Sequence, residues 1–121
     1  MSWIIPLAGA CVRTRVLMVI DDIRDLLTAP DPAASKTLLE RVDATLTNGY
    51  AHALQLEGER LRIERRFAEV VALLPAGADR EHEPELVALA ERLRTSNESI
   101  MTLRALLTSL RERRAELRKA A

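Results

Sequence analysis

The sequence predicts an all-α protein built around one long antiparallel helical hairpin, with a shorter N-terminal helix. The chain of 121 residues is 48% hydrophobic with one Trp, one Tyr and one Phe, so its apolar mass is mainly Leu, Val, Ile and Ala. That composition suits helix-on-helix packing more than sheets. Two long segments also keep an apolar seam with alternating steps of three and four, the spacing of one helix face. The length fits one domain over residues 1–121.

The first 27 residues are expected to form a leader, residues 1–11, and a short helix, residues 12–27. The leader is apolar, but Pro6 interrupts it and no Lys or Arg precedes it, so it suits neither a spanning helix nor a secretory signal. It either packs on the helices or reflects a start assigned too early, which leaves open whether residues 1–17 belong to the native protein. The apolar positions of the short helix recur at helical spacing: Val12, Val16, Val19, Ile23 and Leu26.

A long helix is predicted over residues 32–74. Pro30 and Pro32 separate it from the short helix, because a proline disfavours helix in the residue before it. The dipeptide Asn48-Gly49 is a turn signal, and a break there is the alternative. The seam keeps its register across this point, so we expect one continuous helix with Gly49 at a close helix approach. The seam consists of Leu39, Val42, Leu46, Gly49, Ala53, Leu56, Arg60, Ile63, Phe67, Val70 and Leu74.

A second long helix is predicted over residues 84–118, with Pro84 in its first turn. Two helices of similar length joined by about nine residues should fold back on each other as an antiparallel hairpin. The seam of the second helix consists of Leu89, Leu93, Ser96, Ile100, Leu103, Leu107, Leu110, Arg114 and Leu117.

Each long helix carries a second apolar strip that an isolated hairpin would leave in solvent. The short helix covers only part of it, and soluble monomers rarely expose a large apolar patch. We therefore expect the bundle to be completed by dimerisation, or by a helix of a partner protein. The two strips consist of Leu38, Leu54, Leu61, Ala68 and Val71, and of Leu86, Ala90, Met101 and Leu106.

The net charge limits the classes of binding partner that we expect, and the cysteine content indicates the cellular compartment. The net charge is zero, from 18 basic and 18 acidic residues, which removes the general attraction of a basic domain to nucleic acid or an anionic membrane. Neither is expected as a partner. The single Cys11 excludes an intrachain disulfide, so a reducing cytoplasm is the expected location.

Residues for catalysis or cofactor binding are sparse, so we expect no enzyme activity, no catalytic residues, no cofactor and no metal. The only histidines, His52 and His82, match no metal-ligand spacing. The glycines are scattered and form no phosphate-binding loop. Cys11 has no histidine near it and is expected to be a small buried hydrophobe.

Two arginines interrupt the apolar seams. If the chain reverses near Asp79, residue i faces roughly residue 158 minus i, which places Arg60 near Glu98 and Arg114 near Asp43. One interpretation is that each arginine extends along its stem to solvent. The other is a register lock, in which a buried ion pair penalises slipped alignments.

Arginines are also dense in two further places, at 60–66 with 92–94 and at 111–118. Such clusters could hold an anion or a nucleotide, which is one alternative function. Interleaved glutamates favour a second interpretation, in which the helix faces neutralise their own charge.

Three segments, 50–54, 61–66 and 94–100, give the chain a pattern that resembles flagellar hook-protein export chaperones. The resemblance implies a helical chaperone that holds an amphipathic segment of a secreted subunit. The residues themselves predict a non-enzymatic helical interaction module, an adaptor or regulator that self-associates or binds a partner helix through its second apolar strip.

Overall fold

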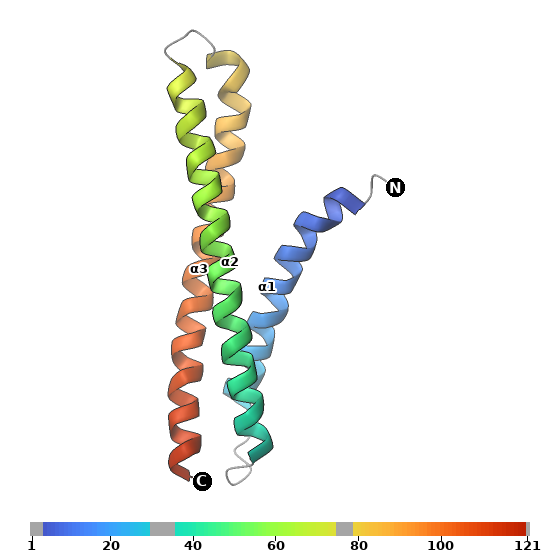
Figure 1. Ribbon diagram of the computed structural model, residues 1–121, viewed down its shortest axis with the longest axis vertical. Coiled ribbons are helices and arrows are strands. Elements are labelled where there is room, and N and C mark those ends of the chain that lie inside the picture. Colours follow the sequence, from blue (N-terminus) through green and yellow to red (C-terminus); the bar gives the residue numbers. More distant parts are fainter. Residues whose placement is uncertain (1–3, 30–35, 75–78, 121) are drawn as a thin grey trace. The chain divides into compact units, whose positions relative to one another are not determined.

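The computed structural model describes residues 4–29, 36–74 and 79–120, and the side chains of 15–29, 36–74 and 81–120. Within these ranges the chain forms three helices and no strand: α1 (Ile4–Thr28), α2 (Lys36–Leu73) and α3 (Asp79–Ala120). The predicted all-α fold is confirmed. In Figure 1, α2 runs in the opposite direction to α3, as the hairpin prediction requires.

Helix α1 begins at Ile4, so the predicted leader over residues 1–11 is wrong for residues 4–11, and the predicted helix over 12–27 is too short. Pro6 is compatible with this start because it lies in the first turn, where no backbone N–H is needed for an intrahelical hydrogen bond. Residues 1–3 lie outside the described residues.

Helix α2 is continuous from Lys36 to Leu73, through Asn48 and Gly49, which confirms the continuous helix over the alternative of a turn. It ends one residue before the predicted limit of 32–74, and the predicted start at 32–35 lies outside the described residues. Glycine costs about 1 kcal/mol relative to alanine inside a helix. Tertiary packing of the seam therefore outweighs this cost and the tendency of Asn-Gly to form a turn.

Helix α3 begins at Asp79 and ends at Ala120, so the predicted helix over 84–118 is too short at both ends. Pro84 lies inside the helix, not in its first turn as predicted. A proline at this position removes the hydrogen bond to the carbonyl of residue 80 and crowds that carbonyl. Acidic residues at 79, 81 and 83 favour a helix start there, since they complement the positive end of the helix dipole.

The chain divides into two compact units, and both α2 and α3 contribute to each. Unit 1 comprises residues 1–52 and 103–121, and unit 2 comprises residues 53–102. The single domain expected from the sequence stays a prediction.

Unit 1 packs three helical segments around one apolar core. Gly49 of α2 lies against Leu107 of α3 and faces Ile23 of α1, so the three helices meet at this glycine. The predicted close approach at Gly49 is confirmed. The core is formed by Val16, Val19, Ile20, Ile23, Leu26, Leu38, Val42, Leu46, Leu103, Leu107, Leu110 and Leu117.

Unit 2 is a hairpin formed by the C-terminal part of α2 and the N-terminal part of α3. Its buried cluster contains Ile63, Val70 and Leu89, with Phe67, Leu86 and Leu93 partly buried against it. Because only two helices supply this core, each of them keeps a wide face in solvent.

Candidate interaction site

Unit 2 exposes most of the large apolar side chains that the second apolar strips were predicted to contain. Leu54 is 68% exposed, Leu61 50%, Val71 42% and Met101 72%. Val87 is also exposed. These side chains lie outside the seam between α2 and α3, so the folding of unit 2 does not bury them.

Two members of the predicted strips are half-buried instead, and a third is buried. Leu86 packs partly against the core of unit 2, and Leu106 of unit 1 is intermediate in exposure. Leu38 is only 6% exposed, while its seam neighbour Leu39 is half-buried. At the start of α2, the buried position is therefore one residue earlier than predicted. Three helices pack together in this unit, and they bury a different side of α2 than a pair of helices would.

A continuous stripe on α2 carries two of these residues, Leu54 and Leu61, and we call it the outer α2 face. It is defined by Leu54, Gly58, Leu61, Arg65 and Ala68, which follow each other at steps of four, three, four and three. Residues at this spacing lie on one side of a helix. A side chain added at Gly58 would meet only the Arg62 guanidinium, with Nη1 at 4.0 Å, so Gly58 leaves an open notch between the two leucines.

The arginines of unit 2 differ sharply in whether they have acidic partners. Arg66 forms a bidentate pair with Glu85, with Nε and Nη2 each 2.9 Å from a carboxylate oxygen. Arg94 contacts Glu91 and Glu98, and the Arg92 guanidinium lies 3.9 Å from Glu59. Most of the predicted arginine cluster is therefore neutralised by local acids.

Arg62 and Arg65 form no ion pair or side-chain hydrogen bond within the part of the chain that the structure describes. The glutamates nearest to them on α2 are already engaged, since Glu64 contacts Arg60 and Glu69 contacts Arg66. Both arginines are exposed. Two hydrated guanidinium groups thus lie on and beside the outer α2 face.

The hydrogen bond between Arg66 and Glu85 lowers the pKa of the Glu85 carboxyl, against a smaller opposing effect of desolvation. The same hydrogen bond raises the pKa of Arg66. His82 Nδ1 lies 3.7 Å from Glu85 and adds to this interaction when protonated. This cluster was not predicted from the sequence, because the fold-back register places Arg66 beside arginines of α3.

Arg60 lies beside Asn97, one residue from Glu98, which the approximate fold-back register places opposite it. Its Nη1 donates a hydrogen bond to Asn97 Oδ1 at 3.3 Å, while Glu98 contacts Arg94. The difference is one residue, which on a helix turns the side chain by about 100° to a different face. Arg60 Nε and Ser96 Oγ are buried without a hydrogen-bond partner, although Glu64 Oε1 lies 3.5 Å from the Arg60 Nε.

Arg114 lies beside Asp43 in unit 1, as the fold-back register predicts, with Nη1 3.3 Å from Oδ1. Both side chains remain about one-third or more exposed. Nearby, Arg113 donates to the Ala29 carbonyl at 2.9 Å and Arg111 donates to the Tyr50 hydroxyl at 3.4 Å. These contacts join the C-terminal part of α3 to the other segments of unit 1.

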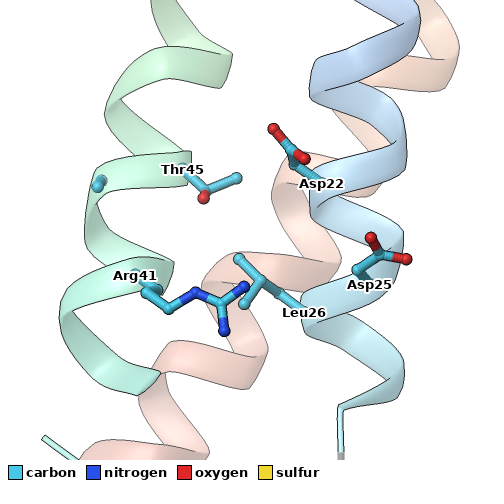
Figure 2. Close-up of a pocket in the computed structure, with 6 residues that line it drawn as sticks. Asp22, Asp25, Leu26, Arg41 and Thr45 are labelled. Atoms are coloured by element: carbon cyan, nitrogen blue, oxygen red, sulfur yellow. The ribbon is translucent and has the colours of Figure 1, made fainter. Parts of the chain in front are cut away.

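A shallow groove of about 260 Å³ lies between α1 and α2 in unit 1. Figure 2 shows the Arg41 guanidinium and the Leu26 side chain between the two helices, with the carboxylates of Asp22 and Asp25 on α1. The remaining lining residues are Ala44 and Thr45. Charges of both signs share this open groove, so it offers neither an anion nor a cation a dedicated set of ligands.

Among the described residues, no three His, Cys, Asp or Glu side chains gather closely enough to hold a metal ion. None of the helices, as far as they are described, combines the length and the apolar character needed to cross a membrane. No family model, curated protein or solved structure matches the chain. The resemblance to export chaperones stays a prediction.

Proposed function

We propose that this chain is a non-enzymatic helical interaction module, an adaptor or regulator that buries its exposed apolar side chains against a helix of a second copy or of another protein. The observation that carries the proposal is the exposure of Leu54, Leu61, Val71 and Met101 on unit 2. Exposed side chains of this size, gathered on one small unit, are typical of protein interaction surfaces. The single cysteine suits a reducing cytoplasm as the place of action.

The test compares two sets of substitutions in the full chain. Leu54→Gln with Leu61→Gln removes the apolar side chains of the outer α2 face. Leu17→Gln with Met18→Gln removes two exposed apolar side chains of α1 and serves as the matched control. Because all four positions are at least half exposed, folding should be retained, which circular dichroism verifies.

Light scattering after size exclusion measures self-association, and affinity purification from native cells compares bound proteins. We expect a dimer or a bound protein that the control retains and the Leu54→Gln/Leu61→Gln variant loses. A wild-type chain that stays monomeric over a wide concentration range, with no bound protein that distinguishes the two variants, would contradict the proposal.

A further inference from the structure

The outer α2 face combines an apolar stripe with two arginines that have no acidic partner in the described structure. Leu54 and Leu61 lie seven residues apart on one side of the helix, and Gly58 leaves the backbone between them open. Arg65 continues the same stripe, and Arg62 lies over the edge of the notch. This arrangement has the shape of a helix-docking surface, with apolar contacts in the centre and charge beside them.

The positive charge of Arg62 and Arg65 indicates the chemistry of the partner. A guanidinium is weakly hydrated and its planar donors match a carboxylate, so an unpaired arginine beside an apolar contact favours an acidic partner. The other described arginines of unit 2 already contact glutamates: Arg60, Arg66, Arg92 and Arg94. Among the arginines of unit 2 whose side chains are described, Arg62 and Arg65 are the two that have no acidic partner.

A second copy of the same face is a poor match. A symmetric dimer centred on Leu61 would bring the two copies of Arg62 together, because residues beside a two-fold axis meet their own copies. Like charges in contact weaken an interface. An amphipathic helix whose leucine stripe is flanked by Asp or Glu would instead pair with both arginines.

We propose that the outer α2 face binds an amphipathic helix of another protein whose apolar stripe is flanked by carboxylates, with Arg62 and Arg65 selecting the acidic flank. This inference rests on the proposed function and names the class of partner. Gly58 then serves to let the partner's backbone approach between Leu54 and Leu61.

The experiment uses three synthetic amphipathic helical peptides with one shared leucine stripe, flanked by Glu, by Gln or by Lys. Fluorescence anisotropy at low salt measures their binding to the full chain. We expect the Glu peptide to bind roughly tenfold more tightly than the Lys peptide. This ratio corresponds to about 1.4 kcal/mol, which two exposed ion pairs can supply together, and added salt should reduce it.

Two double variants with the same change in net charge assign the preference to residues. Arg62→Gln with Arg65→Gln should reduce the preference for the Glu peptide to about twofold or less. Arg92→Gln with Arg94→Gln, two exposed arginines that already have acidic neighbours, should leave it unchanged. Loss of the preference in both variants would overturn the assignment to Arg62 and Arg65.

The remaining outcomes separate this inference from the proposed function. Equal binding of all three peptides, lost on Leu54→Gln/Leu61→Gln substitution, would overturn acidic selection while supporting an apolar interaction surface. Self-association through the same leucines that excludes every peptide would identify a second copy as the occupant and overturn the inference alone. Absence of peptide binding would overturn the inference, and absence of self-association and of a bound native protein as well would contradict the proposed function.

Discussion

Leu107 packs so closely against Gly49 that a Cβ atom added to the glycine would lie 2.5 Å from Leu107 Cδ2. Leu107 is almost fully buried and has little room to move away. We expect Gly49→Ala to lower the free energy of unfolding by roughly 1–2 kcal/mol, because overpacking of the core exceeds the gain in helix propensity.

Gly58→Ala is the matched control, since Gly58 lies in the same helix with no packed neighbour closer than 4.0 Å. It should raise the free energy of unfolding by about 0.5–1 kcal/mol through helix propensity alone. Chemical denaturation monitored by circular dichroism measures both. If Gly49→Ala stabilised the protein as much as Gly58→Ala does, the close approach of α2 and α3 at Leu107 would be wrong.

The contact between Arg114 and Asp43 should contribute only modestly to stability. Both side chains are partly exposed, so solvent screens the interaction. A double-mutant cycle with Arg114→Gln and Asp43→Asn should give a coupling energy of about 0.2–1 kcal/mol that decreases with salt. A coupling above about 2 kcal/mol would instead indicate the desolvated pair that a register lock requires.

Replacing Arg60 by leucine should raise the free energy of unfolding by about 0.5–1 kcal/mol. The substitution removes the buried, unbonded Nε and extends the apolar seam between Leu56 and Ile63. The Arg60 side chain is 34% exposed, and replacement of a partly buried charge by a well-packed apolar residue is often neutral or stabilising.

The pairing of α2 with α3 should survive the same Arg60→Leu substitution. Contacts among the methyl groups of Ile63, Val70 and Leu89, observed by nuclear Overhauser effects, report this pairing. Lower stability together with altered methyl contacts would show that Arg60 locks the register.

The Arg66–Glu85 pair makes the stability of unit 2 depend on pH. The pKa of Glu85 is lower in the folded state than its ordinary value of 4.5, so the folded protein holds the ionised carboxylate more strongly. This contribution is fully present above about pH 4.5 and is lost as the pH falls through the lowered pKa of the folded state.

Melting temperatures of the wild type and of Glu85→Gln should therefore differ near neutral pH and converge as the solution is acidified below pH 4.5. Glu83→Gln changes an exposed carboxylate of the same helix that has no ion pair in the described structure, and serves as the control. A constant difference between wild type and Glu85→Gln at all pH values would rule out the ion pair as its cause.

Arg113 Nη2 donates a hydrogen bond to the backbone carbonyl of Ala29, just beyond the end of α1. In the last turn of α1, the Thr28 hydroxyl donates to the carbonyls of Arg24 and Asp25. Arg113→Ala should lower the free energy of unfolding by roughly 1 kcal/mol, because a partly buried charged donor is lost. Arg118→Ala, at an exposed position of the same helix, should change it by less than about 0.5 kcal/mol, and equal effects would contradict the role of Arg113.

Part of the interaction site could be predicted from the sequence, and part could not. Helical periodicity placed Leu54, Leu61 and Met101 outside the seams, and the structure exposes all three. The sequence could not predict that Arg62 and Arg65 lack ion pairs, because this depends on which glutamates form ion pairs with the neighbouring arginines. That choice is made by the packing of α2 against α3, as in the Arg66–Glu85 pair.

The sequence by itself determined the all-α class, the continuity of α2 through Gly49 and most of the positions at which α2 and α3 face the core. Those properties follow from periodicity along one chain segment, which needs no knowledge of neighbours. Tertiary structure alone decided the axial alignment: Arg60 meets Asn97 and not Glu98, and α1 joins a core that includes Leu38. A shift of one residue preserves the hydrophobic pattern but turns a side chain by about 100°, so only the packed helices fix which charges meet.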